Sequence, residues 1–431
     1  MSAVPRPAVH VVLDPGVPAY GRKGCSVHVQ EVLRRLVARA GGVPVHLVAA
    51  RVGGDAPAGL EGVVVHELGR PRADGPAAAE RALTALDERA AGLVEELVVG
   101  LRGRGGADPV VYQRYGLWSA VTLERARAAG ATTVLEVDAP LVDEQARHRV
   151  LVHEEGAVAL SRRALRAAHA AVAVSGAVAT WARELAGVPV LVVPNGVDAA
   201  RFGPPTGSGA APGEPLVVGF VGTFRPWHGL ELLVDAAASL VGTPDAVRLL
   251  LVGDGPTRER VLARAAAAGV DVVAPGAVAP AEVPALLAGC DVAAAPYPAG
   301  AAYFSPLKLV EYLAAGLPVV ASAVADVPRL LHDEREVLLV PPGDDVALAA
   351  ALRRLVREPA LRARLAAAGR AAAEARSSWD DVVDRTLAAA DAGRASADAA
   401  AAAGGAGPLD RPPAAPSPAA GATGWLAGSR P

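Results

Sequence analysis

Two oppositely charged residues lie three positions apart in the segment YFSPLKLVEYLAAGLPVVAS. Ser305 and Pro306 are typical of the N-cap and first position of a helix. Lys308 and Glu311 would then share one face of its first turns. The amides at Ser305–Leu307 and the ammonium suit a diphosphate, and the carboxylate could accept hydrogen bonds from two vicinal ribose hydroxyls. The spacing fits a surface ion pair equally well.

A second candidate site is the turn in FVGTFRPWHGLELL, where an apolar strand ends at Gly222 and a helix pattern follows. The free N–H groups and the dipole at a helix start favour an anion, and Arg225 adds a forked donor suited to phosphate. Gly253, in the similar turn LLLVGDGP, allows close approach of the backbone. Because glycine-bearing turns are common, an ordinary turn is the alternative for each.

The first half of the chain has a glycine loop, VPAYGRKGCSVHVQEVL. Gly21 and Gly24 predict a flexible loop that leads into a helix at about Ser26, a credible N-cap. Lys23 could contact phosphate and His28 would lie in the first helical turn. A solvated loop charge and a structural histidine are the alternatives.

Polar residues also end a strand in TTVLEVDAPLVDE, namely Glu136 and Asp138. At the carboxyl end of a parallel strand such residues are candidates for a ligand cleft, with capping of the next helix as the alternative. Ser175 is expected to cap a helix, because no GxSxG motif supports acyl transfer. Trp379, on the apolar face of a late helix, is expected to pack rather than bind a ligand.

Composition excludes several function classes. The net charge of −3 gives no field that would recruit nucleic acid, so we expect no nucleic-acid partner. Cys25 and Cys290 belong to no CxxC or Cys/His cluster, which predicts no zinc site. We also expect no other cofactor. The short apolar run at the N-terminus does not resemble a signal peptide, and no membrane span is expected. A cytoplasmic location follows as a prediction.

Strand and helix patterns alternate along the chain, which predicts an α/β fold of two doubly wound parallel sheets facing a cleft. Seven apolar runs in 1–198 form the first domain. The Pro/Gly/Ser-rich stretch 199–215 is read as a linker, and six further runs form a second domain, 216–372. The alanine-, proline- and glycine-rich segment 396–431 is predicted to be a disordered tail.

Together, FVGTFRPWHGLELLVDA, YFSPLKLVEYLAAGLPVVAS and VVPNGVDAARF resemble the GT-B glycosyltransferases of family 4, with LLLVGDGP and LLVPPGD in the same order. The resemblance covers about residues 9–390. It implies two Rossmann-like domains and a C-terminal crossover helix, 373–395, that returns to the first domain. It also implies transfer of a sugar from a nucleotide-diphosphate donor, with retention and without a metal.

The chain departs from the family at several positions. The family places an arginine and a lysine where this chain has Thr223 and His228, so Arg225 would supply the cation, within a subgroup marked by FRPWHG. Glu311 matches the second of two family glutamates, but Tyr303 takes the place of the first. Ala325 and Asp326 replace a usual glycine pair.

We therefore predict a glycosyltransferase that uses Arg225, Lys308 and Glu311, with a glycan, lipid-linked or small-molecule hydroxyl acceptor on the side of the glycine loop. A nucleotide-sugar epimerase of the same fold and a non-catalytic nucleotide-sugar-binding subunit are the alternatives. The arginines of two helices could form basic faces that contact the inner face of a membrane, or they are solvated faces: Arg34, Arg35, Arg39, Arg162, Arg163 and Arg166.

Overall fold

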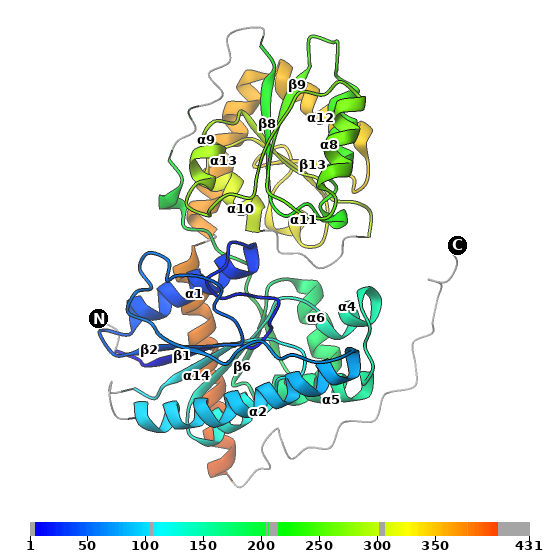
Figure 1. Ribbon diagram of the computed structural model, residues 1–431. Coiled ribbons are helices and arrows are strands. Elements are labelled where there is room, and N and C mark those ends of the chain that lie inside the picture. The colour runs from blue at the N-terminus through cyan, green and yellow to red at the C-terminus, as the bar shows by residue number, and fades with distance from the viewer. Residues whose placement is uncertain are drawn as a thin grey trace, which may run out of the picture.

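The computed structural model describes residues 5–102, 107–203, 206, 214–300, 307–376 and 378–403. Thirteen strands form two fully parallel sheets, one in each of two lobes (Figure 1). The N-lobe sheet has the order β3-β2-β1-β4-β5-β6-β7 and the C-lobe sheet the order β10-β9-β8-β11-β12-β13. The N-lobe strands are β1 (Ala8–Val12), β2 (Val45–Ala49), β3 (Val64–Glu67), β4 (Val110–Arg114), β5 (Thr132–Val137), β6 (Ala170–Ala173) and β7 (Val190–Val192). The C-lobe strands are β8 (Leu216–Val221), β9 (Val247–Val252), β10 (Val272–Gly276), β11 (Val292–Ala295), β12 (Val319–Ser322) and β13 (Leu338–Val340).

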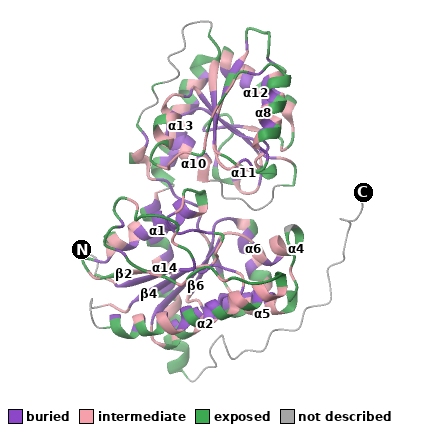
Figure 2. Ribbon diagram, in the orientation of Figure 1, coloured by how far each residue is buried: buried purple, intermediate pink, exposed green. Residues whose placement is uncertain are grey.

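Each sheet has one point where the strand order reverses, between β1 and β4 and between β8 and β11. Ligands of doubly wound sheets bind outside the carboxyl ends of strands at such points. The central strands are short apolar runs, and they are buried because helices cover both faces (Figure 2). The predicted α/β class with two doubly wound sheets is confirmed.

Helices connect the strands. The N-lobe helices are α1 (Gly24–Arg39), α2 (Pro76–Leu101), α3 (Val121–Ala128), α4 (Leu141–His148), α5 (Glu154–Ala167) and α6 (Gly176–Ala186). The C-lobe helices are α7 (Leu230–Ala238), α8 (Arg258–Ala267), α9 (Val283–Ala288), α10 (Leu307–Ala314), α11 (Val327–Leu330), α12 (Asp345–Arg357) and α13 (Pro359–Arg376). Two 3₁₀ turns, η1 (Ala199–Arg201) and η2 (Pro226–His228), and a helix, α14 (Trp379–Ala402), complete the elements of the described residues.

The C-terminal crossover is a separate helix. α13 ends at Arg376 and α14 begins at Trp379, where Ser378 caps it by accepting from two backbone amides. α14 leaves the C-lobe and packs against α1, β5 and β6 of the N-lobe (Figure 1). The predicted bounds of 373–395 were therefore wrong, because the cap at Ser378 starts a new helix.

The start predicted for the disordered tail, residue 396, was also too early in the sequence. α14 continues to Ala402, past the expected start at residue 396, because a run of alanines has high helix propensity. Residues 404–431 lie outside the described residues, as does most of the predicted linker, 199–215. In the described part of the chain, no helix is long and apolar enough to cross a membrane.

Candidate functional site

The end of β8 and the start of α10 come together in the C-lobe. A Cβ placed on Gly222 would lie 2.9 Å from Nζ of Lys308, so only glycine leaves room for the lysine head group there. Gly253 is equally constrained, since its Cβ would lie 1.9 Å from the carbonyl oxygen of Gly222 at a φ of 136°. The Lys308 head group thus constrains Gly222, and close approach of the two strand-end turns constrains Gly253.

The ammonium of Lys308 is buried against aromatic faces. Its Nζ lies 4.2 Å from the ring centroid of Phe220 and 5.7 Å from that of Tyr297. Among the described residues Nζ has no hydrogen-bond partner. Burial lowers the pKa of Lys308 to about 7, while Glu311 acts in the opposite direction. Within the described residues, the three N–H donors of this poorly solvated cation are therefore available to a ligand oxygen.

Tyr312, one turn further along α10, fixes this helix to the strand. Its hydroxyl accepts a 2.7 Å hydrogen bond from the backbone amide of Val221, at the end of β8. The ring is fully buried. Sequence reasoning missed this positioning residue, because a tyrosine among leucines and alanines is indistinguishable from ordinary core.

His228 contributes a neutral side chain. Its Nδ1 is hydrogen-bonded to the carbonyl of Thr223, which makes Nδ1 the donor. Burial, with Lys308 and Arg225 adding to it, lowers the pKa of His228 to about 3. Arg225 is exposed, and its guanidinium lies 5.5 Å from the ring centroid of Trp227, which is itself 39 % exposed rather than packed into the turn. Arg225 is therefore the charged side chain of this turn, and its role as the phosphate-binding cation in place of His228 stays a prediction.

Glu311 lies near the boundary of the two lobes. Burial raises its pKa to about 7, Arg201 opposes this rise and Glu31 of α1 adds to it. Leu307 also faces the N-lobe, because its side chain packs against the apolar cluster around α1 and α14. The first turns of α10 thus contact both lobes. Tyr303, Ser305 and Pro306, which the sequence placed at this helix start, lie outside the described residues.

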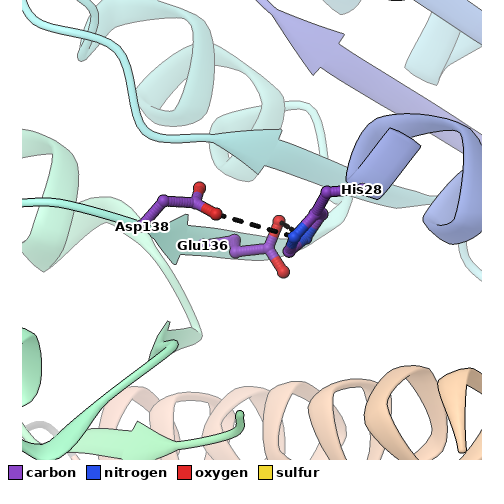
Figure 3. Close-up of side chains that lie close together, drawn as sticks. All are labelled: His28, Glu136 and Asp138. Atoms are coloured by element: carbon purple, nitrogen blue, oxygen red, sulfur yellow. Dashed lines mark ion pairs between the residues drawn. The ribbon is translucent and has the colours of Figure 1, made fainter. Parts of the chain in front are cut away.

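The N-lobe brings together three of its predicted residues. The carboxylates of Glu136 and Asp138, at the end of β5, both point toward the imidazole of His28 on α1 (Figure 3). Nε2 of His28 lies 2.9 Å from Glu136, and Nδ1 lies 3.7 Å from Asp138. His28 and Glu136 are almost completely buried.

Two residues at the end of β4 complete this cluster. Arg114 pairs with Asp138 at 2.9 Å, and the Tyr112 hydroxyl donates to Glu136 at 2.7 Å. Burial opposes ionisation of both His28 and Glu136, but their mutual attraction outweighs it. The attraction between the two side chains raises the pKa of His28 and holds the pKa of Glu136 at about 2.

The same three side chains could in principle reach one metal ion, since their ligand atoms lie within 4.8 Å of one another. However, Arg114 pairs with Asp138 and His28 pairs with Glu136, so the two positive and two negative charges already balance. The arrangement is that of an internal ion-pair network.

Trp379 closes the cluster from α14. The side chain is 1 % exposed and meets His28 edge-on, with ring centroids 4.9 Å apart. The prediction that it packs is confirmed. Ser175 likewise caps α6 by accepting from Val178.

The glycine loop differs from its prediction in one respect. α1 begins at Gly24 with Lys23 at the N-cap, so Ser26 lies inside the helix and its buried hydroxyl does not cap it. Gly21 is required because a Cβ there would lie 2.6 Å from Pro18. Lys23 and Gly24 are exposed.

A cavity of about 680 Å³ opens beyond the ends of β1 and β4. Asp14 and Gly16 line it after β1, Trp118 lines it after β4, and α2 and α4 form its sides with Arg70 and Arg149. Trp118 is buried and has a φ of 75°, an uncommon conformation for a bulky residue. The residues predicted for the acceptor side do not line this cavity: His28, Glu136 and Asp138 pair with one another, and the others lie in the glycine loop.

The six arginines proposed as basic faces are engaged within the protein. On α1 they pair with Glu31, Asp380 and Asp384, and on α5 Arg163 pairs with Glu124, while Arg162 and Arg166 donate to carbonyls that end α6. Acidic partners thus neutralise much of the charge on the α1 face, whereas on α5 only Arg163 has such a partner among the described residues and Arg162 and Arg166 keep their positive charge.

Comparison with known proteins places this geometry in a family. The family model described as Glycosyltransferase Family 4 matches residues 22–201, and the model Glycosyl transferases group 1 matches residues 215–358. A curated relative, the phosphatidyl-myo-inositol mannosyltransferase of Mycobacterium leprae, is 34 % identical over 217 residues, which are 50 % of this chain and 57 % of that protein. The matched part of the chain thus spans little more than half of this relative.

Two solved structures share the fold over most of the chain. Sucrose-phosphate synthase from Thermosynechococcus elongatus has a TM-score of 0.66 at 22 % identity, covering 92 % of this chain and 100 % of that one. HepE of Anabaena in complex with UDP-glucose has a TM-score of 0.63 at 18 % identity, covering 90 % and 99 %. The chain belongs to family 4 of the group 1 glycosyltransferases, and its two parallel sheets form a GT-B fold.

Proposed function

We propose that the protein transfers a sugar from a nucleotide-diphosphate sugar to a hydroxyl acceptor, with retention of the anomeric configuration. The observation that carries this proposal is the ammonium of Lys308, which is buried at the end of β8 without a hydrogen-bond partner among the residues that the structure describes. A charge-assisted hydrogen bond to a diphosphate would satisfy it.

The donor would lie along the carboxyl end of the C-lobe sheet. Lys308 and Arg225 would hold the diphosphate, and Glu311 would accept from the ribose hydroxyls. As the glycosidic bond breaks, negative charge grows on the leaving diphosphate, so cations fixed beside it stabilise the transition state more than the ground state. HepE, whose structure holds UDP-glucose, supports a uridine nucleotide as the first donor to test.

The acceptor would enter from the N-lobe. The 680 Å³ cavity beyond β1 and β4 is large enough for a polyol head group, and Arg70 and Arg149 could meet an anionic acceptor there. The name of the mycobacterial relative supports a lipid-linked acceptor, which would require contact with a membrane surface. A cytoplasmic location and the absence of a metal requirement stay predictions.

Retention is supported by the ion pairs of two N-lobe carboxylates, Glu136 and Asp138. Glu136 and Asp138 are both held in ion pairs, so neither is free to act as the base that an inverting attack on the back face needs. Front-face attack, in which the leaving phosphate takes the acceptor proton, requires no such base.

The proposal is tested by sugar transfer from a panel of UDP- and GDP-sugars to inositol, phosphatidylinositol and simple glycosides, with the product anomer read by NMR. We expect a retained anomer and no measurable transfer by Lys308→Ala. Conversion of donor without acceptor would support the epimerase, and donor binding without turnover would support the binding subunit. Wild-type rates in Lys308→Ala would refute the diphosphate role.

A further inference from the structure

One hydrogen bond joins the two lobes directly at the start of α6. The backbone amide of Gly176, the first residue of that N-lobe helix, donates to a carboxylate oxygen of Asp326 in the C-lobe. The two residues are 150 positions apart in sequence. Asp326 therefore places a negative charge at the N-terminus of a helix in the opposite lobe, where the helix dipole favours it.

The surrounding backbone fits this contact closely. A Cβ on Gly176 would lie 3.1 Å and 3.3 Å from the two oxygens of Asp326, so a side chain there would force the carboxylate to move by a few tenths of an ångström. Ala325, directly before it, has a φ of 47°, a left-handed conformation that costs alanine energy. Tertiary contacts thus hold Asp326 toward α6 in spite of a local cost.

The loop that carries Asp326 is connected to the donor side of the C-lobe. It follows β12, whose last residue, Ser322, accepts a 2.9 Å hydrogen bond from the amide of Tyr297. The Tyr297 ring is one of the two that enclose the Lys308 ammonium. A shift of this loop would therefore disturb Tyr297, which lies beside the proposed diphosphate site.

A second polar contact between the lobes runs through Arg201 in η1. Its guanidinium lies 3.3 Å from Glu31 of α1 and donates to the carbonyl of Pro280 in the C-lobe at 3.1 Å. Because Arg201 comes from the segment that joins the lobes, it restrains their connection. Asp326 differs in bridging two elements that the chain does not otherwise connect.

We propose that Asp326 is a positioning residue: it latches the C-lobe onto the α6 N-terminus and so holds the proposed donor and acceptor sites at working distance. The proposal rests on the proposed function for its kinetic consequence, but the latch itself is a property of the ligand-free protein. Removing it loosens the lobes while leaving each sheet intact.

The test compares the full chain with three variants. Asp326→Ala removes the latch from the C-lobe, and Gly176→Ala presses a methyl group against the carboxylate from the N-lobe. The matched control is Asp344→Ala, because Asp344 also accepts from a helix amide, that of Ala347, but within one lobe. Urea unfolding first establishes that each variant is folded, and small-angle X-ray scattering then measures the radius of gyration without ligand.

We expect both latch variants, but not Asp344→Ala, to show a larger radius of gyration and a wider distance distribution. The interaction of a carboxylate with a helix N-terminus changes an equilibrium constant by about 2- to 30-fold. If the latched arrangement is favoured by that factor, kcat/KM for transfer should fall by about tenfold when the latch is removed. The Kd of UDP-glucose should change less than kcat/KM, because the proposed donor contacts, Lys308, Arg225 and Glu311, all belong to the C-lobe.

Unchanged scattering in both latch variants, or an equal change in Asp344→Ala, would overturn the latch. If wild-type protein neither binds UDP-glucose nor transfers sugar, the proposed function fails while the scattering comparison still decides the latch. Should Asp326→Ala not fold, Gly176→Ala carries the test alone.

Discussion

Replacing Lys308 with methionine should stabilise the protein while abolishing its activity. Methionine is an unbranched side chain one atom shorter than lysine, so it can still pack toward Phe220 but removes the buried charge. The pKa of Lys308 falls from 10.5 to about 7 in the folded protein, mainly through burial. At pH 7 this difference corresponds to about 4 kcal/mol of unfavourable free energy, and residual solvent contact reduces our expectation to about 2–4 kcal/mol.

The sign of the pH dependence follows from the lowered pKa. The folded protein binds fewer protons at Lys308 than the unfolded chain, so the penalty is complete below about pH 7. It declines between pH 7 and 10.5 and is absent above that range. The stability difference between Lys308→Met and wild type should therefore be largest at pH 7 and small at pH 10.

Urea unfolding at these two pH values measures the difference, and Lys23 supplies the control. It is the other lysine of the chain and is exposed, so Lys23→Met should leave stability unchanged within about 0.5 kcal/mol. Lys308→Met should also weaken binding of UDP-glucose by about 10- to 150-fold, the value of a charge-assisted hydrogen bond. A Lys308→Met protein less stable than wild type at pH 7, or a difference that does not shrink with pH, would refute a desolvated ammonium.

Three further changes test the rest of the site. Gly253→Ala places a Cβ 1.9 Å from the carbonyl of Gly222, and we expect a loss of about 2–4 kcal/mol in urea unfolding together with weaker UDP-glucose binding; wild-type values for both would show that the two turns can separate. His28→Leu leaves Glu136 buried without its partner and should cost about 3–5 kcal/mol at pH 6. Because the folded pKa of His28 is raised, the contribution of the imidazolium is complete below 6.5 and is lost as pH rises through that folded pKa, so an unfolding difference that grows toward pH 9 would contradict the ion pair. Trp379→Ala should cost about 3–5 kcal/mol by leaving a cavity against His28, and a change below about 1 kcal/mol in the same assay would show that α14 is not anchored there.

Much of the architecture was predictable from the sequence. The apolar runs predicted every strand of both sheets, because strands covered on both faces need continuous apolar side chains whatever the rest of the fold does. The same alternation predicted that polar residues at strand ends would gather, and Arg114 at the end of β4 does pair with Asp138 after β5. The bounds of α14 escaped prediction, since a single serine cap divides what reads as one alanine-rich helical pattern.

The sequence by itself determined the strands, the turn glycines and the choice of residues at the strand ends. Only the tertiary structure decided the pKa values and the pairing of these residues. Burial against Phe220 and Tyr297 lowers the pKa of Lys308, and Arg114 makes Glu136 and Asp138 part of an ion-pair network instead of free carboxylates. The bridge from Asp326 to Gly176 spans 150 positions and has no local signature. Hydrophobic periodicity and turn chemistry depend on residues close together in sequence, so they can be recognised in the sequence itself. Desolvation and ion pairing depend on which distant residues the fold brings within a few ångströms.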